Sequence, residues 1–318
     1  MVRNFEGAPL IKYTLRKMVL SSNFELDINE SDYLLLNSSK DCLLGAFSLE
    51  EKYDLLISNF LELEKECLNI TCEQMINNHD GYSDMFDIKG RLNRRVVNLL
   101  TSCRLYVDHY SQHVKACLFE EPNLLITKAF FSQEYDCCFE YRFMEALRNY
   151  VQHRGLAVHS VKLAHAWTSI PKKDGELEHN TSFFTHRDDV ISDKAFKRMV
   201  ANEMPDKVNL LLASRKYISS ISKIHGEIRK QISNNVTKSR EVISEKIELF
   251  KEKSNGNSIG LAALKIDEIK ENAVTESINL LLDWDDVRLR LTKKNKTLYS
   301  IGQSYVSSSA YNKAFKRN

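Results

Sequence analysis

A long stretch with regularly spaced apolar residues limits this chain to folds in which an unusually long helix packs against another helix. Between Asp206 and Lys253, apolar residues recur mostly at intervals of three or four, which places them on one side of an α-helix. These residues are Val208, Leu211, Ile218, Ile221, Ile224, Ile228, Ile232, Val236, Ile243, Ile247 and Phe250. An unbroken helix over this range would be roughly 70 Å long. It needs a second helix along its length, from this chain or from a second copy.

Further amphipathic segments predict that most of the chain is helical. The predicted helices run from Ser48 to about Asn77, from about Ser83 to Leu118, from Pro122 to His153, and from about Ile259 to Leu291. Ser48 and Glu51 have the spacing of a capping box, and Gly155 follows the third of these helices. Gly and Pro are scarce, at 10 and 4 of 318 residues, which disfavours a turn-rich β fold. Long helices joined by short loops predict an antiparallel bundle.

Two stretches of alternating polarity predict a β-hairpin inserted into this mainly α fold. They cover residues 157–167 and 176–187, and the turn sequence Pro171–Gly175 joins them. Residues 10–15 fit either a short strand or a helix, and Asp193 can cap a short helix. We therefore expect an N-terminal segment plus helical bundle over 1–155, a hairpin over 156–190, and a long-helix C-terminal region with a basic tail over 191–318.

Composition favours a cytoplasmic protein without membrane spans. The N-terminus has no apolar core of a signal peptide, and no apolar run approaches the roughly 18 residues of a membrane span. The seven cysteines include no CxxC pair, and their odd number fits reduced thiols. The net charge of +2 gives no global attraction to nucleic acid, so RNA binding would need a local patch.

The segment with the clearest chemical content is Arg148-Asn149-Tyr150-Val151-Gln152-His153. At about 100° per residue, the polar side chains share one helix face. These are Glu145, Arg148, Asn149, Gln152 and His153, while Phe143, Met144, Leu147, Tyr150 and Val151 share the other face. A guanidinium suits a phosphate and an imidazole suits a proton in transit, so this face predicts phosphoryl chemistry.

Arg148, Asn149 and His153 resemble the signature of the HEPN superfamily of helical ribonucleases, in which four to six residues separate Arg from His and the first of them is usually polar. The resemblance covers about residues 50–155 and implies a HEPN-like bundle. It implies a metal-independent endoribonuclease without a cofactor, whose 2′-hydroxyl attack leaves 2′,3′-cyclic phosphate and 5′-hydroxyl ends. His153 would act as base or acid, Arg148 would stabilise the phosphate, and Asn149 would orient one of them, with possible support from Glu145 or Gln152. The family often has Tyr two positions after His, where this chain has Gly155.

The same resemblance implies partners. The active cleft of the family lies at a dimer interface, so the expected assembly is a homodimer that binds an RNA substrate. Such proteins act in phage defence or as toxins, often with an antitoxin or another regulator. Basic residues that can contact RNA are Arg154, Lys293, Lys294 and Lys296, the last three in a C-terminal region dotted with aromatic residues.

Several other patterns leave alternatives open. Arg104–His109 and Arg154–His159 repeat the Arg–His spacing, although Leu105 and Gly155 follow these arginines. His109, His113 and Cys117 share a helix face that can bind zinc or simply be amphipathic. Nucleophilic catalysis by Cys137 or Cys138 competes with simple packing of small thiols. The hairpin histidines at 159, 165, 179 and 186 can line a groove or be exposed strand residues. The functional alternative is a non-catalytic helical scaffold that binds RNA or protein.

Overall fold

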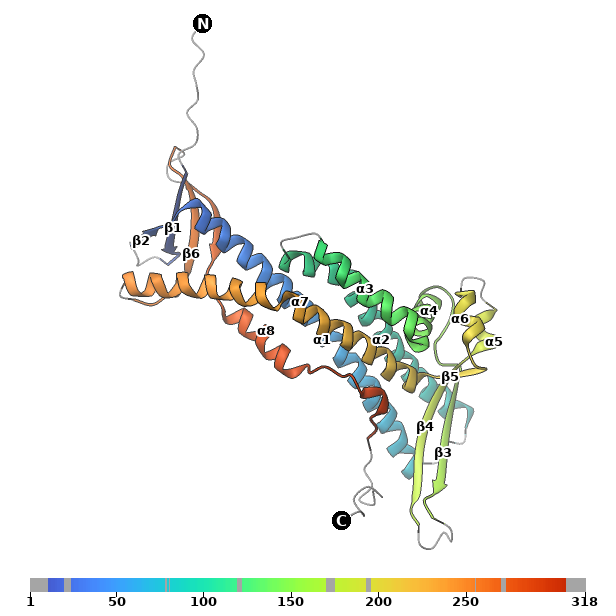
Figure 1. The fold of residues 1–318 in the computed structure, drawn as a ribbon. Helices are drawn as coiled ribbons and strands as arrows, with labels where there is room; N and C mark the ends of the chain where they lie inside the picture. Colours follow the sequence, from blue (N-terminus) through green and yellow to red (C-terminus); the bar gives the residue numbers. More distant parts are fainter. Residues whose placement is uncertain are drawn as a thin grey trace, which may run out of the picture. The chain divides into compact units, whose positions relative to one another are not determined.

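The chain is mainly helical, as predicted, with two small antiparallel sheets (Figure 1). The computed structural model describes residues 11–19, 24–77, 79, 81–118, 122–169, 175–192, 196–254, 256–269 and 273–306. Most of the predicted turn at Pro171–Gly175, the predicted cap Asp193 and the tail from residue 307 lie outside these residues. Contacts divide the chain into unit 1, residues 1–51, 109–125 and 228–294, and unit 2, residues 52–108, 126–227 and 295–318.

Three long helices each contribute to both units. They are α1 (Glu30–Ile76), α2 (Tyr82–Cys117) and α7 (Leu210–Ser254), of 47, 36 and 45 residues. Apart from the half-buried Leu211, the predicted apolar residues within α7 are buried, and Ile218, Ile221 and Ile228 are fully enclosed. Among the described residues, no helix has both the length and the apolar character needed to cross a membrane.

Unit 1 contains a four-stranded sheet in the order β2-β1-β6-β7. Its further elements are β1 (Ile11–Lys17), β2 (Glu25–Asp27), β6 (Leu261–Asp267), β7 (Ala273–Asn279) and α8 (Asp283–Lys294). The predicted helix over 259–291 is therefore wrong before Asp283, where α8 begins. Strand β6 lies between β1 and β7 and has six of its seven residues buried, so it lacks the alternation that marks a half-exposed strand.

Unit 2 contains the predicted β-hairpin and the helices beside it. Its further elements are α3 (Pro122–Cys137), α4 (Phe139–His153), β3 (Ser160–Trp167), β4 (Leu177–His186), α5 (Arg187–Ile191), α6 (Arg198–Glu203), β5 (Lys207–Asn209) and the short 3-10 helix η2 (Ile301–Gln303). Strands β3 and β4 pair in register from Ser160↔Phe184 to Trp167↔Leu177, and β5 adds a third strand.

Three predicted helix boundaries are wrong because caps and a backbone break override the apolar pattern. Helix α1 begins at Glu30, where the Asn29 side chain accepts a hydrogen bond from the Asp32 backbone N–H, so Ser48 lies inside the helix. Cys138, with extended backbone angles, separates α3 from α4. Helix α7 begins after Asn209, whose side chain caps it, because residues 207–209 pair with β4.

Polar side chains in the core of unit 2 connect α1, α2 and α7. The Tyr53 hydroxyl donates to Ser222 Oγ at 2.8 Å, and its ring stacks on the His225 imidazole with centroids 3.7 Å apart. Tyr106 Oη lies 3.0 Å from His225 Nδ1. These groups are almost completely enclosed, so their mutual hydrogen bonds offset the cost of leaving water.

An ion-pair network links α1 to α2 nearer the helix ends. Arg91 donates to Glu66 at 2.7 Å and to Glu73 at 2.6 Å, and Arg95 donates to Glu66 at 3.1 Å. The hydrogen bond from Arg91 is the main cause that lowers the pKa of the Glu73 carboxyl. The network therefore fixes the register of the two helices by charge as well as by packing.

In unit 1 the close approach of α1 and α2 requires Gly45. A Cβ at this position would lie 2.7 Å from the His113 carbonyl oxygen and 2.9 Å from Ala116 Cβ. We predict that Gly45→Ala destabilises the protein by about 1–3 kcal/mol, because the backbones must separate to admit the methyl group. Chemical denaturation followed by circular dichroism measures the change.

Gly90 is the matched control, since it lies inside α2 with open space where its Cβ would be. Gly90→Ala should stabilise the protein by about 0.5–1 kcal/mol through helix propensity alone. A Gly45→Ala variant that gains stability as Gly90→Ala does would contradict the close approach.

Candidate functional site

The candidate motif occupies the C-terminal end of α4. The residues of α4 that are buried are Tyr141, Phe143, Met144, Ala146 and Leu147. Of the predicted packing face, Tyr150 and Val151 are half-buried. Arg148 is half-buried, whereas Asn149, Gln152 and His153 are exposed. The helix therefore divides into a packed face and a polar face, as the pattern predicts.

The guanidinium of Arg148 is held by a neighbour on its own helix. Its Nη1 donates to Gln152 Oε1 at 2.8 Å, a contact between residues one turn apart. Its Nε is buried and has no hydrogen-bond partner among the described residues. Gln152 thus orients the guanidinium, a group whose planar N–H donors suit an anion.

His153 is the last residue of α4 and presents an exposed imidazole. No hydrogen bond within the described part of the chain fixes this ring or the amide of Asn149. Both side chains can therefore change rotamer beside Arg148. The arrangement offers one fixed cation with a titratable ring and an amide beside it.

Glu145 has a different role from its neighbours on the polar face. Its carboxylate accepts a hydrogen bond of 2.5 Å from the Tyr217 hydroxyl of α7. Burial is the main cause that raises the pKa of Tyr217 well above its ordinary value, so the phenol stays a donor. Glu145 thus joins α4 to α7 instead of pairing with Arg148.

The chain leaves α4 through a tight contact at Gly155. A Cβ at Gly155 would lie 2.6 Å from the Tyr150 hydroxyl, so Tyr150 fills the space that a larger residue would need. The exposed Arg154 follows the helix directly, and its backbone N–H donates to the Tyr150 carbonyl. The ring of Tyr150 also meets His159 edge to face, with centroids 6.2 Å apart. Tyr150 therefore connects the end of α4 to the base of the hairpin.

His159 lies at this base in a defined tautomer. Its Nδ1 accepts a 3.0 Å hydrogen bond from the His186 backbone N–H, so its Nε2 carries the proton and donates to the Leu156 carbonyl at 2.9 Å. Burial lowers the pKa of His159, and the nearby Asp189 carboxylate partly opposes this shift. Protonation would place an N–H on Nδ1, which faces Asp189 Oδ2 at 3.1 Å and can no longer accept from His186.

The neighbouring side chains of Ser160, His186 and Asp189 are arranged in the sequence serine, histidine, aspartate of a catalytic triad, but their distances do not fit one. Ser160 Oγ lies 2.6 Å from His186 Nε2, but His186 Nδ1 is 3.6 Å from Asp189 Oδ2. That last separation is too long for a hydrogen bond, so the carboxylate does not orient the ring as an activated serine requires. We interpret these contacts as structural, because they hold the base of the hairpin together and His159 packs against Tyr150 of α4.

The other predicted groups belong to other elements of the chain. His165 and His179 face each other farther along the hairpin, with ring centroids 6.0 Å apart. Lys293 and Lys294 form the last turn of α8 in unit 1, whereas α4 belongs to unit 2. Lys296 follows α8 at the start of the C-terminal arm.

The alternative motifs are engaged in other contacts. Arg104 pairs with Asp108 at 2.5 Å, one turn along α2. The Cys117 thiol donates to backbone carbonyls. Within the described residues, no group of three or more His, Cys, Asp or Glu side chains is placed to hold a metal ion. Of the adjacent cysteines, Cys137 is exposed and Cys138 interrupts the helices.

Comparison of the chain with known protein families, with curated proteins and with solved structures finds no match.

The buried His159 predicts a loss of stability in mild acid. Because its pKa is lowered on folding, the unfolded chain binds a proton more readily, and stability falls as pH drops below the ordinary histidine pKa of about 6.5. We expect the melting temperature of the wild-type chain to fall between pH 7.5 and pH 5.5, and His159→Gln to reduce this fall. His165→Gln, at an exposed strand position, is the control. An equal effect of both substitutions would refute the role of His159.

Proposed function

We propose that this chain is a metal-independent endoribonuclease whose site is the polar face at the end of α4. The observation that supports this proposal is the fixed guanidinium of Arg148, held by Gln152, on the face that carries the exposed Asn149 and His153. A cation with restricted motion beside a free imidazole suits a phosphodiester that is to be cleaved.

In the proposed reaction the RNA supplies its own nucleophile. The 2′-hydroxyl attacks the adjacent phosphorus, its proton passes to a base, and the 5′-oxygen leaves with a proton from an acid. Arg148 stabilises the extra negative charge on the phosphate as the new P–O bond forms. His153 transfers one of the protons, and Asn149 orients the phosphate or the imidazole. Gln152 acts through Arg148, and Glu145 acts through the packing of α4 on α7.

Two proton transfers need two groups, and one copy of α4 carries one exposed histidine in this motif. We propose that a second copy of the chain supplies the second imidazole, so that the functional nuclease is a homodimer. The basic Arg154 would contact RNA beside the cleaved bond. A role in growth arrest or phage defence, under an antitoxin or another regulator, rests on the HEPN resemblance alone.

The nuclease proposal predicts that Arg148→Ala and His153→Ala each lower RNA cleavage by about 100-fold or more, because each removes a group that acts in the transition state. Gel analysis of a labelled RNA, in the presence of a chelator, measures the rate. His109→Ala is the control, since it removes the histidine of the competing Arg104–His109 pair.

The outcomes separate the two motifs. Loss of cleavage in His109→Ala with full activity in His153→Ala would move the site to α2. Undiminished cleavage by both α4 variants, with unchanged circular dichroism, would end the proposal.

A second candidate function is a protein-binding scaffold. The tip formed by the end of α1 and the start of α2 exposes Met75, Ile76, Tyr82 and Phe86, with 63%, 78%, 89% and 61% of each residue's surface accessible. Clustered apolar side chains of this kind mark interaction surfaces. A scaffold would leave RNA ends intact after long incubation and would not arrest growth when overproduced alone.

A further inference from the structure

Two cysteines that are far apart in the sequence meet in unit 1. Cys42 lies in α1 and Cys117 is the last residue of α2, and both are completely buried. The Cys117 thiol donates a hydrogen bond to the Cys42 carbonyl oxygen at 3.2 Å, and the two side chains are close enough for each to shift the pKa of the other. All seven cysteines of the chain are in the thiol form.

The meeting of these thiols follows from the close approach of the helices at Gly45. Residue 45 is one turn beyond Cys42, and its absent Cβ would lie 3.3 Å from Cys117 Sγ. The absence of a side chain at residue 45 thus lets the two helices come close enough for the Cys117 thiol to reach residue 42. Both sulfurs are enclosed at this contact.

The surroundings distinguish the two sulfurs. The interaction with the Cys117 side chain is the main cause that lowers the pKa of Cys42 to about 7. Ser239 and the positive charge of Arg288 act in the same direction, against burial and the charge of Asp285. The pKa of Cys117 is raised by the same contact and by burial. Cys42 is thus the better nucleophile near neutral pH.

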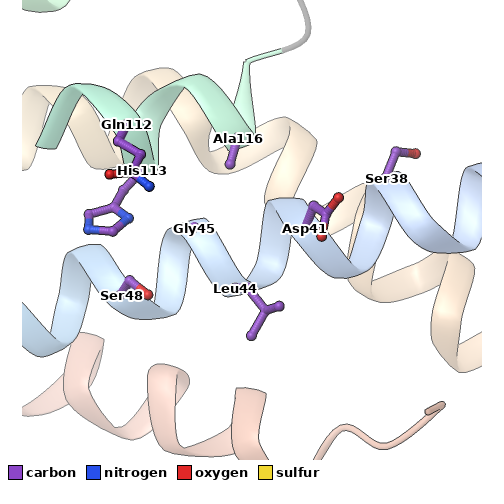
Figure 2. A pocket seen from close by; sticks show the side chains of 8 residues that line it. All are labelled: Ser38, Asp41, Leu44, Gly45, Ser48, Gln112, His113 and Ala116. Carbon is purple, nitrogen blue, oxygen red and sulfur yellow. The ribbon is translucent and has the colours of Figure 1, made fainter. Parts of the chain in front are cut away.

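A pocket of about 530 Å³ follows the α1–α2 seam beside this pair (Figure 2). Its lining residues from α1 are Ser38, Asp41, Leu44, Gly45 and Ser48, and those from α2 are Gln112, His113 and Ala116. Gly45 belongs both to this lining and to the contact with Cys117. A small molecule in the pocket would therefore be separated from the sulfur of Cys117 by a residue that has no side chain.

We propose that Cys42 and Cys117 form a modification site that low-molecular-weight disulfides oxidise reversibly to an internal disulfide. When α1 and α2 separate at Gly45 beside the pocket, the Cys42 thiolate attacks one sulfur of the small disulfide, forming a mixed disulfide and releasing the first small thiolate. The Cys117 thiol then loses its proton and attacks Cys42 Sγ, which releases the second small thiolate. The two small thiolates take up the two protons, so two protein thiols are oxidised and one small disulfide is reduced. The product links α1 to α2 covalently.

The direct test uses the folded full chain and oxidised glutathione as the probe. After oxidation, remaining thiols are blocked with N-ethylmaleimide during denaturation, and the chain is cut with trypsin without reduction. The tryptic peptides 41–52 and 116–128 each contain one of the two cysteines and no other cysteine. We expect most of the protein to yield these peptides linked together, and dithiothreitol to separate them.

The exposed Cys72 provides the control. Cys72→Ser should leave the linked product unchanged, whereas Cys42→Ala should abolish it. If Cys42→Ala does not fold, the presence or absence of the linked peptides in the wild-type chain still decides the test. Glutathione attached to Cys72 and Cys137, with peptides 41–52 and 116–128 recovered only as separate blocked thiols, would overturn the proposal. A 42–117 link that forms only after denaturation would also overturn it.

Discussion

Burial of the apolar side of α7 is the constraint on which both units depend. A helix of 45 residues with an apolar residue at nearly every turn along one side cannot remain in water as a single rod. Within unit 2 the partner contacts include Tyr53 of α1 with Ser222, and within unit 1 they include Glu50 of α1 with Arg229. Burial of the apolar side of α7 drives the pairing of the helices, and the polar contacts fix their register. The buried tyrosines, His225 and the ion pairs therefore lie beside the apolar side of α7.

Sequence periodicity predicted the elements in which one face is buried and the other is solvated. The helix over 83–118 and both hairpin strands agree with the structure within a few residues. The pattern failed for β6, because a central strand buried on both faces has no alternation. It also failed at Asn29, Cys138 and Asn209, where a cap or a single extended residue sets the helix boundary. Such boundaries depend on a few backbone angles that apolar spacing does not encode.

The candidate site was predictable in its composition but not in its contacts. The pattern placed Arg148, Gln152 and His153 on one helix face, and the hydrogen bond between Arg148 and Gln152 follows from their four-residue spacing. The partner of Glu145 could not be predicted, since Tyr217 is 72 residues away in α7. The same holds for the contacts of His159 with His186 and Asp189, which depend on strand register. These tertiary contacts hold α4 in place and leave its terminal imidazole exposed.

The central claim is that the end of α4 cleaves RNA by attack of the 2′-hydroxyl. The most direct measurement is the chemistry of the RNA ends after incubation with the purified chain in chelator. We predict 2′,3′-cyclic phosphate on one fragment and 5′-hydroxyl on the other, identified by mass spectrometry. Intact RNA, or fragments that end in 3′-hydroxyl and 5′-phosphate, would contradict the account.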